Sequence, residues 1–178
     1  MAAARVRRRV RRSLPARADR RSRATLEVEG RCAPWAGARL RRDLTRLAAL
    51  AARTIERPVR LDVALLGDRA MDRLHRRHLG VPGTTDVLSY VLEDGPRGLV
   101  GALALGARVA RREALARGHP PYHEALLYAV HGTLHLLGHD DHAPRDRARM
   151  RRAERAWLAA LGLGDVFGAE PGRGRRRT

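Results

Sequence analysis

Apolar and polar residues alternate in two early segments of the chain, and a helical period separates these segments. Residues 26–29 and 59–66 alternate, which predicts two strands. Residues 36–55 instead place apolar side chains on one helical stripe, made of Leu40, Leu44, Leu47, Leu50 and Ala51. The chain is therefore expected to begin as strand, helix, strand.

The later pattern predicts one more helix, two more strands and then helices only. Asp68 is a good helix cap, and the helix that it starts is expected to run to about His78. Residues 86–91 and 99–105 read as strands. Helices are expected over residues 107–117, 121–137 and 144–161. Because strands gather in the first half and helices in the second, the expected fold class is α+β, a small mixed β-sheet packed by helices.

Composition favours one compact domain in a reducing compartment. The chain has 178 residues, and 44% of them are hydrophobic, enough for one core. Its single cysteine, Cys32, excludes an intramolecular disulfide, so the cytoplasm is the expected location. A disulfide-free exported protein is the alternative. No apolar run approaches the roughly 20 residues of a membrane helix, so no membrane partner is expected.

The charge balance points to a polyanionic partner. The formal net charge is +18, and all 37 residues counted as Lys+Arg are arginines. A coding bias toward GC-rich codons explains arginine in place of lysine, but it does not explain why bases outnumber the 19 acids. RNA or DNA is the expected partner, ahead of an acidic membrane. A merely solvated, charged surface is the alternative.

Both ends of the chain are basic and fall outside the expected domain. Residues 1–24 form an arginine-rich arm that cannot bury a core and is expected to be disordered. A transit peptide would also be rich in arginine and poor in acids, and it is the alternative. Residues 168–178 form a second basic tail. The single domain is therefore expected to cover residues 25–167.

A cluster of histidines carries the strongest chemical signal. His131 and His135 are four residues apart in the helix predicted over residues 121–137, so both imidazoles lie on one helical face within reach of one metal ion. The helix is apolar on nearly every side, and buried imidazoles need partners. Gly138 can end the helix, after which the chain turns back and offers His142 as a third ligand.

Three protein ligands and one water form the usual catalytic zinc site, so one Zn²⁺ per chain is expected. The alternative is that His131 and His135 are core histidines bonded to backbone carbonyls. Gly132 lies between them, where the common zinc-protease motif has its glutamate base. It leaves room for a water or for close packing, and it argues against a standard metalloprotease.

The stretch from His131 to Gly138 resembles the YbeY family, whose pattern is H-G-x-L-H-L-x-G-x-D-H. A second block, Thr85 to Tyr90, is similar to the family's T-D-V-L-S-F. The resemblance covers about residues 25–164. It implies an α+β fold with zinc at the base of a basic cleft. It also implies a bacterial metal-dependent endoribonuclease, specific for single strands, that acts in 16S ribosomal RNA processing and ribosome maturation.

Three positions depart from the family pattern. The family's third histidine falls on Asp141, so His142 is the expected ligand only if the turn holds one extra residue; Asp141 or His139 is the alternative. The family's activity-related arginine falls on Leu79, and Arg76, three residues earlier, is the candidate replacement. The family's acidic residue after the strand glycine Gly101 is replaced by Ala102.

The leading hypothesis is hydrolysis of an RNA phosphodiester by a water that zinc activates, with an arginine such as Arg76 stabilising the phosphate charge. The expected partners are ribosomal RNA and the small ribosomal subunit. The first alternative is a non-catalytic RNA-binding assembly factor with a structural zinc, which a fourth ligand such as His139 would favour. A peptidase is the second. No general base stands out, although Asp140 and Asp141 are close.

Overall fold

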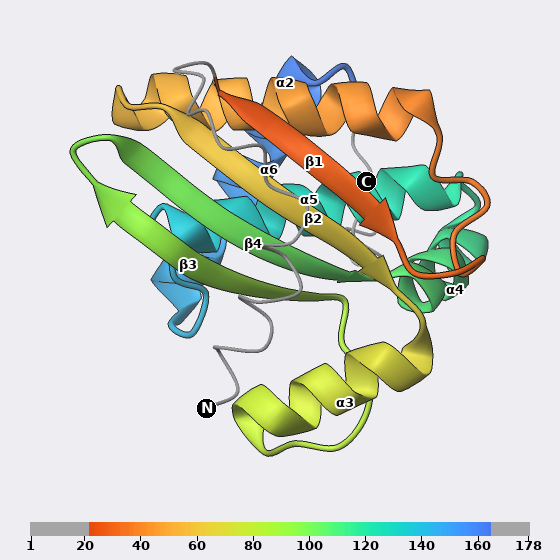
Figure 1. Cartoon of the computed structure of the whole chain (residues 1–178). Coiled ribbons are helices and arrows are strands. Elements are labelled where there is room, and N and C mark those ends of the chain that lie inside the picture. The colour runs from red at the N-terminus through yellow and green to blue at the C-terminus, as the bar shows by residue number, and fades with distance from the viewer. Residues whose placement is uncertain (1–21, 165–178) are drawn as a thin grey trace, which may run out of the picture.

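The computed structural model describes residues 22–164, which form four strands and five helices (Figure 1). The strands are β1 (Arg23–Val28), β2 (Val59–Leu66), β3 (Val87–Gly95) and β4 (Gly98–Gly106). The helices are α2 (Ala38–Ile55), α3 (Asp68–Leu79), α4 (Ala107–Arg117), α5 (Pro121–Leu136) and α6 (Pro144–Ala160). The expected α+β class with a mixed sheet is confirmed.

The four strands make one sheet in the order β1-β2-β4-β3. Strands β1, β2 and β4 are parallel to one another, and β3 pairs antiparallel with β4 through a hairpin. A parallel pair needs a crossover, which α2 supplies between β1 and β2. The carboxyl ends of β1, β2 and β4 therefore share one edge of the sheet, where β3 begins.

Helices α2 and α5 cover one face of the sheet and enclose the main core. The predicted stripe of α2 points into this core, where Leu44 and Leu47 are fully buried. Helix α5 is buried along most of its length, as its apolar sequence predicts. It packs against α2, α4 and α6 as well as the sheet, and Figure 1 shows α2, α5 and α6 behind the strands.

Helix α3 packs on the opposite face of the sheet. Its buried residue Met71 contacts Leu88 of β3 and Ala104 of β4. Alternation along β2 separates the two faces, since Leu65 belongs to the main core and Leu66 to the cluster under α3. The connections that follow the neighbouring strands β1 and β2 therefore leave toward opposite faces.

The first strand differs from its predicted bounds. β1 begins at Arg23, two residues before the expected start of the domain, because Arg23 and Ala24 continue the parallel ladder with β2. Most of the predicted arm, residues 1–24, and the whole predicted tail, residues 168–178, lie outside the described residues. Within residues 22–164, no helix is both long and apolar enough to cross a membrane.

Candidate metal centre

Helix α5 presents the two predicted histidines side by side at its carboxyl-terminal end. The ring centroids of His131 and His135 lie 4.5 Å apart, and their Nε2 atoms are 2.9 Å apart. Both side chains are only partly exposed. The spacing of four residues therefore brings the two imidazoles together as expected.

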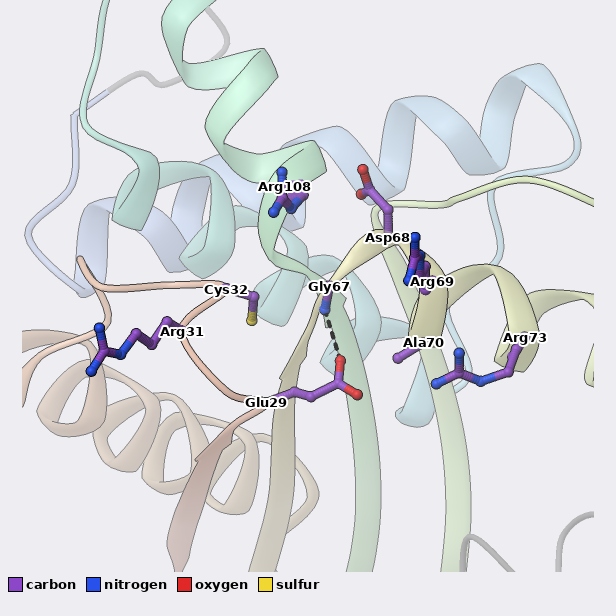
Figure 2. Close-up of a pocket in the computed structure, with 9 residues that line it drawn as sticks. All are labelled: Glu29, Arg31, Cys32, Gly67, Asp68, Arg69, Ala70, Arg73 and Arg108. Atoms are coloured by element: carbon purple, nitrogen blue, oxygen red, sulfur yellow. Dashed lines mark hydrogen bonds between the residues drawn. The ribbon is translucent and has the colours of Figure 1, made fainter.

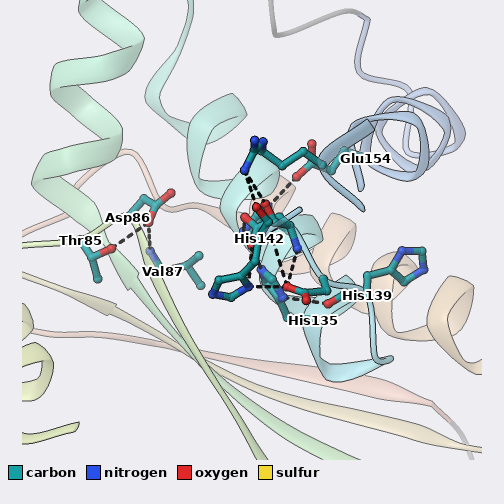
Figure 3. A network of polar contacts seen from close by, with 11 residues as sticks. Thr85, Asp86, Val87, His135, His139, His142 and Glu154 are labelled. Atoms are coloured by element: carbon teal, nitrogen blue, oxygen red, sulfur yellow. Dashed lines mark hydrogen bonds and ion pairs between the residues drawn. The ribbon is translucent and has the colours of Figure 1, made fainter. Parts of the chain in front are cut away.

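The other ring nitrogen of each histidine has an acceptor of its own. Nδ1 of His131 lies 2.6 Å from Oε1 of Glu154, and Nδ1 of His135 lies 2.9 Å from the backbone carbonyl oxygen of His139 (Figure 3). A carboxylate and a carbonyl oxygen only accept hydrogen bonds, so each Nδ1 must donate. In the neutral state both Nε2 atoms then carry lone pairs, and these face each other.

Two facing lone pairs at 2.9 Å repel, and a cation between them removes the repulsion. A proton can serve as that cation, and so can a metal ion. Metal-bound histidines almost always donate their other N–H to a carboxylate or a backbone carbonyl, as His131 and His135 do here. The donor arrangement therefore fits a metal ion.

Glu154 is a site residue that the sequence reasoning missed. It lies on the inner stripe of α6, four residues from Met150 and from Leu158, and it is 4% exposed. A carboxylate on an otherwise apolar stripe is costly to bury without a partner, and this signal was present in the sequence. Burial acts to lower the pKa of His131, but the hydrogen bond and charge of Glu154 outweigh it and raise that pKa.

The third side chain beside the histidines is Asp141. Its carboxylate oxygens lie 3.8 Å from Nε2 of His131 and 3.9 Å from Nε2 of His135. Together, His131, His135 and Asp141 form one of two groups of potential metal ligands within the described part of the chain. Gly138 makes this possible: with φ at +87° it follows the end of α5 and reverses the chain, as predicted.

His142, the predicted third ligand, lies at the outer side of this turn. Its side chain is 88% exposed, and its Nδ1 contacts the carboxylate of Asp140. That contact raises the pKa of His142 and lowers the pKa of Asp140 to about 2. His142 belongs to the second group of potential ligands, with Asp140 and Asp141. Its role as third ligand stays a prediction, which requires the loop to turn inward.

His139 contributes through its backbone rather than through its ring. Its carbonyl accepts the hydrogen bond from His135, and Figure 3 shows its imidazole turned away from that residue. Among the described residues, His139 belongs to neither group of potential metal ligands.

Gly132 faces the sheet. A Cβ at this position would lie 2.9 Å from side-chain atoms of both Val87 and Leu103. Of the two explanations for Gly132, close packing is therefore the one that the structure supports. The Thr85–Tyr90 block contributes to this close packing, because Val87 of β3 lies directly under Gly132 of α5.

A cleft of about 500 Å³ opens beside His131. Its polar lining includes Thr84, Thr85, Asp86, Arg112, Glu113, Arg117, Tyr128 and Glu154. Arg117 is held by the fully buried Glu124 at 2.5 Å, whereas Arg112 pairs with the half-exposed Asp68 at 3.3 Å. Burial and the charge of Glu124 raise the pKa of Tyr128, so its phenol stays protonated at neutral pH.

Arg76, the predicted catalytic arginine, lies on α3 and binds Asp72. Its Nε donates to both carboxylate oxygens at 3.0 Å, and its side chain is 59% exposed. Arg112 and Arg117, rather than Arg76, are among the residues that line the cleft beside His131. The catalytic role of Arg76 stays a prediction, and the sequence reasoning missed Arg112 and Arg117 of α4.

A small α+β domain with two histidines and a carboxylate gathered beside a cleft is a candidate metal-dependent hydrolase. Comparison with known proteins makes this specific. The family model described as endoribonuclease YbeY matches residues 36–162, and the chain belongs to this family.

Several curated relatives carry the same description. The endoribonuclease YbeY of Wolinella succinogenes is 38% identical over 112 residues, covering 63% of this chain and 79% of the relative. That of Desulfitobacterium hafniense is 34% identical over 134 residues, covering 70% and 84%. That of Cutibacterium acnes is 37% identical over 109 residues, covering 56% and 70%.

The fold is also found in a solved structure. The solution structure of a protein from Thermotoga maritima aligns with a TM-score of 0.52 and 18% identity, covering 84% of this chain and all of that one. At this identity the likeness concerns the fold alone.

Proposed function

We propose that this protein is a zinc-dependent endoribonuclease that cleaves single-stranded segments of 16S ribosomal RNA in the small ribosomal subunit, in the cytoplasm. The facing Nε2 atoms of His131 and His135 carry the proposal, because their arrangement suits a shared cation. Membership of an endoribonuclease family supports RNA as the substrate. The ribosomal target rests on the resemblance in the histidine motif and the Thr85–Tyr90 block.

The ligands would be His131, His135 and either Asp141 or His142. Two imidazoles with one further side chain are a usual set for catalytic zinc, which leaves one position for water or substrate. When bound, such a cation polarises a phosphoryl oxygen and acidifies a water molecule. The chain's own residues hold the ligands in place: Glu154 and the carbonyl of His139 fix both ring orientations.

The cleft beside His131 is the proposed seat of the scissile phosphate. Arg112 lines it and is 55% exposed, so its guanidinium can leave Asp68 and stabilise negative charge on the phosphate. Arg117 is held by hydrogen bonds to Glu113 and Glu124, so its side chain forms a fixed part of the cleft lining. Asp86 lines the cleft and is the candidate to orient an attacking water.

A non-catalytic assembly factor with a structural metal is the second candidate. Structural zinc sites are closed by four protein ligands. Within residues 22–164, the group around the facing histidines has three members, which favours an open, catalytic site. A peptidase is disfavoured because Gly132 offers no carboxylate as a base.

Single-turnover cleavage of a small-subunit RNA fragment tests the proposal. The zinc-loaded protein should cleave the fragment, and a chelator should abolish cleavage. His135→Ala should lower the rate by at least about two orders of magnitude, the scale of losing a principal stabiliser of the transition state. His75→Ala, on α3, is the matched control and should keep the full rate. Cleavage that survives both the chelator and His135→Ala would rule the proposal out.

A further inference from the structure

A second cavity, of about 750 Å³, lies at the edge of the sheet where β1, β2 and β4 end. Glu29 follows β1, Gly67 follows β2, and Arg108 stands in the first turn of α4, directly after β4. The connections after β1 and β2 leave toward opposite faces of the sheet. Such a divergence opens a crevice outside the strand ends, and in open sheets this is the usual place for a ligand.

Arginines dominate the lining of this crevice. Four of them surround it: Arg31, Arg69, Arg73 and Arg108 (Figure 2). All four are exposed, and within residues 22–164 they form no ion pair. They differ in this from Arg117 and Arg76, which carboxylates hold. Four arginines outside any of these ion pairs, gathered around one crevice, create a positive potential suited to an anion.

The two acidic residues of the crevice are already engaged. Glu29 accepts a hydrogen bond from the backbone N–H of Gly67 at 3.1 Å, and Asp68 pairs with Arg112. Burial and the charge of Glu29 raise the pKa of the Cys32 thiol, so Cys32 adds no negative charge at neutral pH. The lining therefore has a surplus of positive charge.

The crevice and the metal cleft meet at one ion pair. Asp68 lines the crevice, Arg112 lines the cleft beside His131, and the two side chains contact each other at 3.3 Å. Arg108 and Arg112 stand one turn apart on α4, so both point to the same side of that helix. A path marked by Arg112 and Arg108 therefore runs along α4 from the metal cleft to the crevice.

Charge is distributed unequally along this path. In the metal cleft, Arg112 and Arg117 are matched by Asp86, Glu113 and Glu154. In the crevice, four arginines face two engaged acids. Side chains of the cleft alone thus offer little net attraction to a polyanion, whereas the crevice does.

We propose that this arginine crevice binds backbone phosphates of the RNA substrate, away from the bond that is cleaved. The proposal rests on the proposed function, because it assigns the same RNA strand to both sites. Arginine forks suit phosphate oxygens, and contacts of this kind position a strand without reading its sequence. RNA long enough to reach the crevice should bind more tightly than RNA that fills only the metal cleft.

Equilibrium binding in the presence of a chelator tests the crevice without any cleavage. The probes are a single-stranded tetranucleotide and a strand several times longer with the same base composition. The variant is Arg73→Ala/Arg108→Ala, which removes one arginine from each side of the crevice. The matched control is Arg53→Ala/Arg97→Ala, since both residues are exposed and lie toward the opposite, amino-terminal edge of β2 and β4.

The crevice variant should bind the long strand roughly tenfold more weakly at low salt, and its log–log salt slope should flatten by about 1.4, the effect of two lost phosphate contacts on single-stranded RNA. The tetranucleotide offers too few phosphates to span both sites and should bind weakly to both proteins, and the control should keep the wild-type affinity for the long strand. Equal losses in the variant and the control would overturn the proposal, because only net charge would then matter. The proposal would also be overturned if the crevice variant lost affinity for inorganic pyrophosphate but kept its affinity for the long strand. That result would indicate a site for a free phosphate compound.

Failure of the crevice and failure of the endoribonuclease are separable. Absence of zinc-dependent cleavage by wild type would remove the catalytic proposal, while the binding difference between short and long RNA would still be measured. Conversely, normal cleavage with no length-dependent loss in the crevice variant would remove the crevice proposal alone.

Discussion

The site depends on which nitrogen of each imidazole carries its proton. Glu154 and the carbonyl of His139 both accept from Nδ1, and this choice turns the two Nε2 lone pairs toward each other. The two histidines alone would not define that geometry, since either ring could rotate or change tautomer. The acceptors therefore decide whether the pair can share a cation.

Glu154→Gln is expected to lower zinc affinity by about 10–100-fold, the usual cost of losing the partner of a metal-bound histidine. Glutamine still offers an oxygen that accepts the hydrogen bond from His131. It lacks the negative charge that makes the imidazole a stronger electron-pair donor to the metal. Competition with a chromophoric chelator measures the affinity. Glu93→Gln, at an exposed position of β3, is the control. An affinity equal to wild type would show that Glu154 does not act on the metal.

The third ligand can be decided by comparing Asp141→Ala with His142→Ala. The placement of the Asp141 carboxylate, within 4 Å of both Nε2 atoms, predicts the larger loss of zinc affinity for Asp141→Ala. His142 is more exposed and already contacts Asp140, so its loss should cost less. If His142→Ala is the more damaging change, zinc reorganises the turn and the ligand expected from the sequence is correct.

At the scale of elements, helix α5 must lie close to β3 and β4 to hold the histidines over the cleft. Gly132 allows that approach, as a side chain there would press on Val87 and Leu103. A β-branched valine in a strand has little freedom to move aside. The distance between helix and sheet therefore depends on this glycine and also on Gly101 of β4, where a Cβ would press on the side chain of Leu136 in α5.

Gly132→Ala should destabilise the protein by about 1–2 kcal/mol. Overpacking typically costs about 1–3 kcal/mol, and the better helix propensity of alanine returns up to about 1 kcal/mol. Urea unfolding with the metal removed measures the change. Gly95→Ala is the control, because open space surrounds Gly95 and its φ is not positive. A variant as stable as wild type would mean that the sheet yields easily at this point.

The helices and strands were largely predictable from the sequence, whereas the tertiary contacts between them were not. The period of α2 and the alternation of β2 encode which face is buried, so Leu40, Leu44, Leu47 and Ala51 of the predicted stripe are buried, whereas Leu50 is only partly buried. The role of Glu154 depends on α6 folding back on α5, a contact between positions 23 residues apart in the chain. Arg112 and Arg117 likewise gain their place only from how α4 packs. Local patterns do not carry such information.

At the scale of the whole molecule, the fold shows where part of the arginine excess gathers. Net charge alone could only indicate a polyanionic partner. The fold gathers arginines from the loop after β1, from α3 and from α4 at one edge of the sheet, next to the metal cleft. The sequence could not predict this crevice, since its lining joins segments that only the parallel order of β1, β2 and β4 brings together.

The central claim is that His131 and His135 share one metal ion, and anomalous diffraction from crystals grown with zinc tests it most directly. We expect one strong zinc peak between the two rings, at about 2.0–2.1 Å from each Nε2, with a carboxylate oxygen of Asp141 as the third protein ligand. The two Nε2 atoms should move apart from their 2.9 Å separation to admit the ion. Zinc found only between Asp140 and His142, with the two imidazoles still in direct contact, would contradict the account.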